Sequence, residues 1–180
     1  LIPGYTRAFN VEDNSDLYFQ GLNFRYFGRN RYNSAIFLKN TSDVLIEDCT
    51  FRFCNMYIWL KGICNRITVQ DCSFYDNFGD WSFTMLKAGY QGYHGEIEGG
   101  AVGTDASYSG KGLVIRRNRI NGLFDGMHLC PWRKDSAVTN ETDVYSNEIT
   151  NVMDDFIETD GYARNVRIFD NYMRVSLSGI

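Results

Sequence analysis

Apolar residues alternate with polar ones along this chain, and the alternation recurs six times in one pattern. In each copy two apolar residues lie two positions apart, a turn position follows three residues later, and another apolar residue comes two positions after it. The copies are Leu17, Phe19, Leu22, Phe24; Val44, Ile46, Cys49, Phe51; Ile67, Val69, Cys72, Phe74; Leu113, Ile115, Asn118, Ile120; Thr142, Val144, Asn147, Ile149; and Val166, Ile168, Asn171, Met173. A period of two residues predicts strands with one buried face.

The starting positions of the copies step by 27, 23, 46, 29 and 24 residues. Steps of this size in a β-rich sequence are typical of a solenoid in which each coil consists of three short strands. A leucine-rich repeat would have its own signature of Leu and Asn, which is absent. The repeat therefore predicts an all-β solenoid of about six coils, in one domain that covers residues 1–180.

The turn position of the repeat forms a column of its own. Asn118, Asn147 and Asn171 are expected to stack as an asparagine ladder, in which each amide bonds the coils on both sides. Cys49 and Cys72 occupy the same column, so we expect them to be buried, within contact range and without a required disulfide. The five cysteines show no zinc-site spacing.

Each predicted coil contains one further strand, whose first and third residues face the core. These strands cover residues 9–12, 36–39, 58–61, 84–87, 127–130 and 157–160. Equal register places the second residues in one outward column and the fourth residues in another. The second residues are Asn10, Phe37, Trp59, Met85, His128 and Glu158; the fourth are Glu12, Lys39, Lys61, Lys87, Cys130 and Asp160.

These columns predict a surface that could bind a polysaccharide. Phe37 and Trp59, with Tyr57 one column earlier, would form an exposed aromatic strip on which sugars stack, or else the floor under long loops. Lys39, Lys61 and Lys87 would repel one another unless an anion lies across them, which favours an acidic substrate; the alternative is a solvated lysine edge.

Three insertions interrupt the repeat, at residues 25–32, 88–110 and 131–140. The last two are expected to overhang the outward columns and form the walls of a groove, to which Trp132 and Arg133 would contribute substrate contacts. The predicted strand at residues 9–12 has no full coil before it, and Ile180 begins another strand. Because solenoids normally cap both ends, we expect this chain to be a piece of a longer polypeptide.

The candidate catalytic residues lie on two neighbouring coils. Asp154, Asp155 and Glu158 are followed closely by Asp160, a candidate for substrate binding, so that four carboxylates fall within seven residues. Asp125 occupies the position of Asp155 one coil earlier, and His128 that of Glu158. Adjacent carboxylates divide into an acid and a base, and a His held by Glu can transfer protons. The alternatives are aspartates that bond local backbone at turns and a surface His–Glu ion pair.

The stacked coils and the asparagine ladder resemble the right-handed parallel β-helix family, which includes pectate-lyase-like and polygalacturonase-like carbohydrate-active enzymes. Phe124-Asp125-Gly126, followed one coil later by Asp154-Asp155, resembles the polygalacturonase and rhamnogalacturonase arrangement, in which Asn-Thr-Asp and Asp-Asp motifs supply inverting carboxylates. That resemblance implies that Asp125, Asp154 and Asp155 are the acid and bases. Here Leu123-Phe124 replaces Asn-Thr, and no Gly-His-Gly or Arg-Ile-Lys motif follows. Because of these departures, the resemblance does not assign the chain to either of these enzyme families.

The leading hypothesis is a glycoside hydrolase that acts on a polysaccharide, with Asp125, Asp154, Asp155, His128 and Glu158 as catalytic residues and neither metal nor cofactor. One alternative is a polysaccharide lyase or epimerase that acts on uronates with a Lys or His base and Ca²⁺. The other is a structural or adhesive β-helix that binds glycans without catalysis, and a tailspike-like protein of that kind would be a trimer.

Charge and hydropathy exclude other classes of protein. A net charge of −4 and a pI near 5.2 argue against a general nucleic-acid-binding protein. No run of about 18 apolar residues predicts a membrane helix, and the N-terminal residues do not form a signal peptide. A carbohydrate-active β-helix is expected outside the cell, in the periplasm or at the cell surface.

Overall fold

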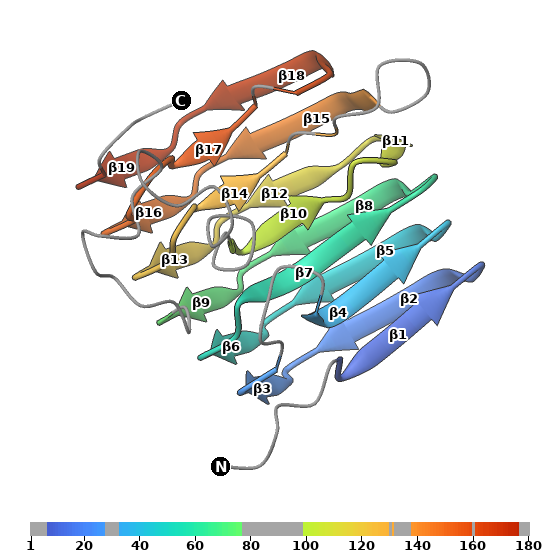
Figure 1. The fold of residues 1–180 in the computed structure, drawn as a ribbon, viewed down its shortest axis with the longest axis horizontal. Helices are drawn as coiled ribbons and strands as arrows, with labels where there is room; N and C mark the ends of the chain where they lie inside the picture. The colour runs from blue at the N-terminus through green and yellow to red at the C-terminus, as the bar shows by residue number, and fades with distance from the viewer. Residues whose placement is uncertain are drawn as a thin grey trace.

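A computed structural model of the chain describes residues 7–27, 33–76, 99–129, 131, 138–159 and 161–176. All regular elements of this part of the chain are β-strands, and they form three parallel sheets (Figure 1). The sheets wrap around one core as a β-helix of about five turns. The prediction of an all-β solenoid is therefore confirmed.

Each turn of the solenoid contributes one strand to each sheet. The first sheet contains β1 (Phe9–Glu12), β4 (Ser34–Lys39), β7 (Met56–Lys61), β10 (Val102–Thr104), β14 (Met127–His128) and β17 (Ile157–Glu158). The second contains β2 (Ser15–Gln20), β5 (Ser42–Glu47), β8 (Asn65–Gln70), β12 (Val114–Arg116), β15 (Val138–Tyr145) and β18 (Ala163–Phe169), with β11 (Ser109–Lys111) also paired to β15. The third contains β3 (Asn23–Arg25), β6 (Thr50–Arg52), β9 (Ser73–Tyr75), β13 (Arg119–Asn121), β16 (Glu148–Thr150) and β19 (Tyr172–Arg174).

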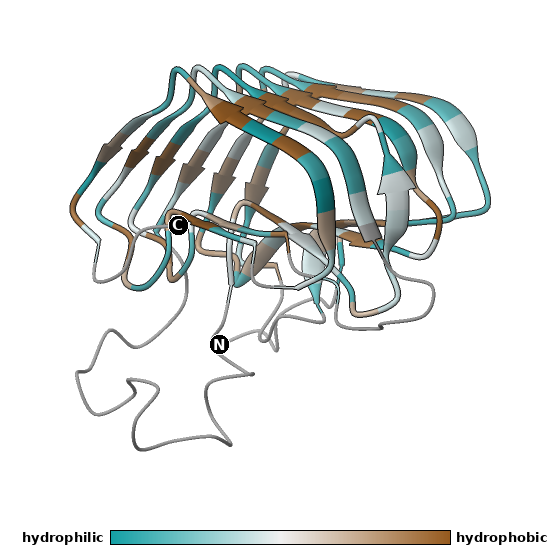
Figure 2. Ribbon diagram, turned by 90° about the horizontal axis from the view of Figure 1, so that it is seen from above, coloured by the Kyte–Doolittle hydropathy of each residue, from teal (hydrophilic) through white to brown (hydrophobic). Residues whose placement is uncertain are grey.

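The repeat sets the register between coils. Val44 pairs with Ile67 and Ile115 pairs with Val144, as the alternation predicts. Figure 2 shows the result as hydrophobic and hydrophilic bands that run across neighbouring strands. The predicted inward residues are all buried in the four middle sets, half of them are buried in the first set, and those of the last set are partly exposed. A one-residue slip would turn every apolar side chain outward, so the hydrophobic pattern fixes this register.

The turns between the second and third sheets share one backbone feature. The residue just before each turn position has a left-handed φ of 52° to 66°. These residues are Gly21, Asp48, Asp71, Arg117, Ser146 and Asp170. Gly and Asp adopt this conformation more easily than most residues. The same sharp bend therefore recurs in every coil and brings the turn residues into one column.

The asparagine ladder is present in that column. Asn118 Nδ2 donates to Asn147 Oδ1 (3.0 Å), and Asn147 Nδ2 donates to Asn171 Oδ1 (2.9 Å). Asn147 Nδ2 also donates to the Ile115 carbonyl (3.0 Å), and Asn147 Oδ1 accepts the Asn118 backbone N–H (3.1 Å). The ladder thus satisfies buried backbone groups where the chain turns and no strand can bond them.

Replacing Asn147 with Ala is expected to lower the free energy of unfolding by about 2–4 kcal/mol, because it leaves buried donors and acceptors of Asn118 and Ile115 without a partner. Asn171→Ala is the matched control. Asn171 is partly exposed, so water can replace its bonds and the loss should be smaller. Urea unfolding of both variants gives the comparison, and equal losses would show that the ladder does not carry this stability.

The cysteines of the column behave as structural residues. Cys49 and Cys72 are each 1% exposed and form no disulfide. Their thiols donate to the carbonyls of Glu47 (3.3 Å) and Gln70 (3.2 Å). Elsewhere in the core, burial raises the pKa of Cys54 to about 12 and also raises that of Cys64, which keeps both thiols protonated.

One position in the first sheet was predicted for the wrong segment of the chain. The position expected for residues 84–87 in the first sheet belongs to β10, whose Val102 pairs with Ile58 and with Met127. Residues 84–87 themselves lie outside the described residues. The insertion predicted at 88–110 is therefore misplaced, since residues 102–104 and 109–111 are strands. The other two predicted insertions also overlap strands, because β3 ends at Arg25 and β15 begins at Val138.

Candidate functional site

Five titratable side chains from two neighbouring coils meet on the outer side of the first sheet. Asp125 and His128 belong to the coil of β14, and Asp154, Asp155 and Glu158 belong to the coil of β17. We call these five residues the acid–base cluster. The cluster consists of two overlapping groups of three residues. In each group, one oxygen or nitrogen atom from every residue lies within 4.8 Å of the corresponding atoms of the other two residues. The groups are Asp125, His128 and Glu158, and Asp125, Asp154 and Asp155. Asp125 joins the two groups.

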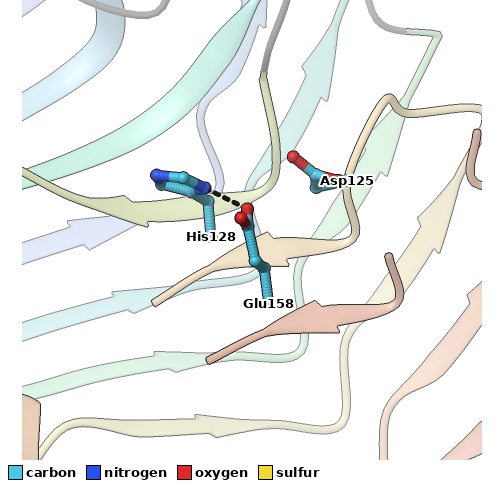
Figure 3. A group of neighbouring side chains, drawn as sticks. All are labelled: Asp125, His128 and Glu158. Atoms are coloured by element: carbon cyan, nitrogen blue, oxygen red, sulfur yellow. Dashed lines mark hydrogen bonds and ion pairs between the residues drawn. The ribbon is translucent and has the colours of Figure 1, made fainter. Parts of the chain in front are cut away.

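His128 and Glu158 form a buried ion pair. The strands β14 and β17 pair in register, with Met127 opposite Ile157 and His128 opposite Glu158. Met127 and Ile157 point into the core, so the next residue in each strand points outward. His128 Nδ1 contacts Glu158 Oε2, as the dashed line in Figure 3 shows. This contact fixes the orientation of the imidazole ring.

Asp125 lies beside this pair, just before β14 (Figure 3). Its side chain is 1% exposed, and its Oδ1 accepts a hydrogen bond from the Asp155 backbone N–H (3.2 Å). Asp155 occupies the same place before β17 and is partly exposed, whereas Asp154 is 9% exposed. Asp155 is therefore the carboxylate of the acid–base cluster most accessible to a substrate.

A glycine allows the two coils to approach so closely. A Cβ atom at Gly126 would lie 2.2 Å from the Phe156 carbonyl oxygen and 2.9 Å from Ile149 Cγ2. Gly126 N–H donates to the Asp155 carbonyl (2.9 Å), and Met127 N–H donates to the Phe156 carbonyl (3.1 Å). These bonds hold the segment that carries Asp125 against the segment that carries Asp155.

A second glycine brings an aromatic ring against the histidine. Gly103 occupies the outward column between Trp59 and His128, because it pairs with both. A Cβ atom at Gly103 would lie 2.6 Å from the Trp59 ring. The indole therefore extends over Gly103 and stacks on His128, with 6.2 Å between ring centroids and 17° between planes. This stacking holds the plane of the imidazole ring.

Most of the acid–base cluster is buried, whereas the sequence predicted a site on the solvent side of the strand. His128 is 2% exposed and Glu158 7% exposed. The alternation of a strand tells on which side of the sheet a residue lies, but not whether other groups cover that side. The four carboxylates and one imidazole of the two overlapping groups carry a formal charge of −3 when all five are ionised. Charge of this size is costly to bury unless protons, a cation or a bound ligand compensate it.

The aromatic strip is buried as well, which contradicts the prediction that it forms an exposed surface for sugar stacking. Phe37 and Trp59 are each 4% exposed and pack with Met56 in a small cluster separate from the core. Tyr57 is fully buried and points inward, where its ring contacts Phe51 and Phe74. Its hydroxyl donates to the Tyr75 carbonyl (2.7 Å), which satisfies the polar end. Tyr57 is therefore a core residue, and Phe37 does not offer an open stacking face.

The predicted lysine ladder is a pair of adjacent lysines with a carboxylate on either side. Lys39 Nζ bonds Glu12 (2.8 Å), and Lys61 Nζ lies 3.6 Å from Asp105. The bond to Glu12 raises the pKa of Lys39, and Lys39 lowers that of Glu12. Asp105 follows β10 and takes the place expected for Lys87. The two lysines therefore need no external anion. The predicted binding residues Lys87, Trp132, Arg133 and Asp160 lie outside the described residues.

The acid–base cluster has the donor atoms for a divalent cation. Carboxylate oxygens are the preferred ligands of Ca²⁺ and Mg²⁺, so Asp125, Asp154 and Asp155 suit such ions. The group that contains His128 adds an imidazole nitrogen, which favours Mn²⁺ or Zn²⁺. A cation between His128 and Glu158 would have to separate the ion pair that they form.

Sequence reasoning missed Gly103 and Asp105 as parts of this region, and it placed Gly126 beside Asp125 without its packing role. A signal for β10 was present in the spacing, since Thr104 precedes Leu113 by nine residues and Leu60 precedes Ile67 by seven. Among the described residues, no helix is long and apolar enough to cross a membrane. Comparison of the chain with family models, curated proteins and solved structures found no match.

Proposed function

We propose that this protein cleaves a polysaccharide as a glycoside hydrolase, with the acid–base cluster as its catalytic centre. The observation that carries the proposal is the convergence of four carboxylates and one imidazole from two adjacent coils. Holding groups of like charge together costs free energy, and such clusters concentrate at functional sites. The carbohydrate class comes by analogy with polygalacturonase-like β-helices, which place aspartates on adjacent coils. A protein of this class acts outside the cytoplasm.

The geometry supports a division of labour among the carboxylates. Asp125 and Asp155 each place a carboxylate oxygen within 4.8 Å of the other. In the proposed mechanism one member of the pair donates a proton to the leaving oxygen while the other activates water. Asp155 is the more exposed and faces the glycosidic bond. Asp125 accepts a hydrogen bond from the Asp155 backbone N–H and serves as the second carboxylate of the pair.

The charge of the region favours an uncharged glycan over a uronate. Lys39 and Lys61 already bond Glu12 and Asp105, so they do not favour an acidic substrate. The acid–base cluster is itself negative and would repel a carboxylate-bearing sugar unless a cation lay between them.

A lyase or epimerase is the second candidate, and the His128–Glu158 pair is the observation that favours it. A histidine held by a carboxylate can abstract the proton at C5 of a uronate. In that mechanism a divalent cation on the carboxylates would neutralise the substrate carboxylate.

Product analysis separates these functions. The purified protein is incubated with a panel of neutral and uronate-containing polysaccharides, and new reducing ends and ultraviolet-absorbing unsaturated sugars are measured. The hydrolase proposal expects reducing ends from a neutral glycan without unsaturated product. Unsaturated product from a uronate would instead establish the lyase. Binding of a glycan with neither product would overturn the hydrolase and the lyase and leave an adhesive β-helix or an epimerase, which a change of C5 configuration in the recovered uronate would reveal.

A further inference from the structure

A groove crosses the outer face of the second sheet, away from the strands that carry the acid–base cluster. It has a volume of about 470 Å³ and is formed by residues of β2, β5, β8 and β12. Its lining includes Asp16, Tyr18, Asp43, Leu45, Arg66 and Arg116. Four adjacent strands span three spacings of about 4.8 Å each, or roughly 14 Å. The groove is therefore long enough for a short stretch of a linear polymer.

Polar side chains in the groove are fixed by bonds between coils. Arg66 Nε and Nη2 donate to the two carboxylate oxygens of Asp43 (2.6 and 2.5 Å). Farther along the strands, Arg116 donates twice to Gln70 Oε1 (2.9 and 2.7 Å). Gln70 Nε2 in turn donates to Glu47 Oε2 (2.6 Å). A ligand that bonds to these planar groups loses little side-chain entropy, because the groups are already ordered.

The charge and shape of the lining select an uncharged ligand with many hydroxyls. Asp16 and Asp43 balance Arg66 and Arg116, so the lining has no formal net charge. An anionic polymer would require an excess of cations, which this groove lacks. A carboxylate, amide or guanidinium group can hydrogen-bond to two adjacent hydroxyls at once, and sugars carry such vicinal hydroxyl pairs.

Tyr18 gives the groove an aromatic face at its β2 side. The ring is 55% exposed, although the residue lies in the middle of a strand. Its hydroxyl donates to Glu47, and this hydrogen bond raises the pKa of Tyr18 to about 12, so the phenol stays neutral. An exposed ring that is held in place offers a flat apolar surface for the apolar face of a sugar. Leu45, in the adjacent strand, continues that surface.

We propose that the groove of the second sheet binds a neutral stretch of a polysaccharide, as a non-catalytic site on a different face from the acid–base cluster. The proposal rests on the proposed function only for the class of ligand. Such a site would hold the polymer on the solenoid and raise its effective concentration near the catalytic centre.

Affinity measurements on the full chain test this proposal. Soluble glucan, mannan, xylan and galactan serve as neutral probes, with polygalacturonate and heparin as charged ones, in affinity electrophoresis and calorimetry. All variants carry Asp155→Asn, so that turnover does not remove the probe. Tyr18→Ala is expected to weaken binding of a neutral polymer about tenfold, because it removes the stacking ring. Tyr172→Ala is the matched control, since Tyr172 is 56% exposed on the third sheet.

The results separate failure of this site from failure of the proposed function. Equal affinities of the Tyr18 and Tyr172 variants would overturn the groove as a saccharide site, whatever the activity of the wild type. Preference for polygalacturonate or heparin over every neutral probe would also overturn it. Loss of neutral-polymer binding in the Tyr18 variant would support the site even if the wild type cleaved no glycan, in which case only the proposed hydrolase would fail.

Discussion

Replacing Asp155 with Asn is expected to lower the rate of polysaccharide cleavage by about 10² to 10⁴-fold, the contribution of a general acid or base. Asn keeps the shape of the side chain but cannot transfer a proton in its place. Asp155 is the partly exposed carboxylate of the acid–base cluster, and its neighbours Asp125 and Asp154 are more deeply buried. Initial rates of reducing-end formation by the full chain measure the effect.

The thermal midpoint of the same variant distinguishes a catalytic role from a structural one. Asn removes one negative charge from a group of close carboxylates, so the midpoint should stay unchanged or rise. Asp71→Asn is the control, since Asp71 forms an exposed ion pair with Arg117 (2.7 Å), and such pairs contribute at most about 1 kcal/mol. That variant should cleave at the wild-type rate. If Asp155→Asn cleaved at a normal rate too, Asp155 would be a turn residue without a catalytic role.

The register of the solenoid could be predicted because one face of every strand is buried. Val44, Ile67, Ile115 and Val144 must all point inward, and the period of two residues then leaves one alignment of the coils. The same alignment places His128 opposite Glu158, as the structure shows. The proximity of candidate residues from different coils thus followed from hydrophobic positions alone.

The strand β10 could not be predicted in the same way. Val102-Gly103-Thr104 is short and contains a glycine, whereas Thr84-Met85-Leu86-Lys87 matches the other copies of the strand in side-chain type. The glycine departs from the pattern because Trp59 occupies the space over it. Local propensity therefore favoured the wrong segment, and a contact between coils determined the right one.

Exposure was the other property that the pattern did not determine. Tyr57 adjoins the inward Ile58 in the chain, and alternation therefore placed it outside. In the structure both residues belong to the core, and the Tyr57 hydroxyl has an internal carbonyl partner. Burial of His128 depends likewise on packing with Trp59, a residue 69 positions earlier in the chain.

Replacing Gly126 with Ala is expected to lower the free energy of unfolding by about 3–5 kcal/mol. The added Cβ would lie 2.2 Å from the Phe156 carbonyl oxygen, and backbone cannot move aside as a flexible side chain can. The clash is relieved only if the coils of β14 and β17 separate. That separation breaks the hydrogen bonds that Gly126 N–H and Met127 N–H donate. Each buried group left without a partner costs about 1–3 kcal/mol. Urea unfolding of the variant measures the loss.

Gly21→Ala is the control for this effect. Gly21 has a left-handed φ of 66° and open space around its Cβ position, so alanine there should cost only the backbone strain of about 1 kcal/mol. Separation of the coils would also move Asp125 and His128 away from Asp155 and Glu158. Gly126→Ala should therefore lose cleavage activity even under conditions where it remains folded, and Gly21→Ala should not. A Gly126→Ala protein with wild-type stability and activity would show that the site does not depend on the close approach of these two coils.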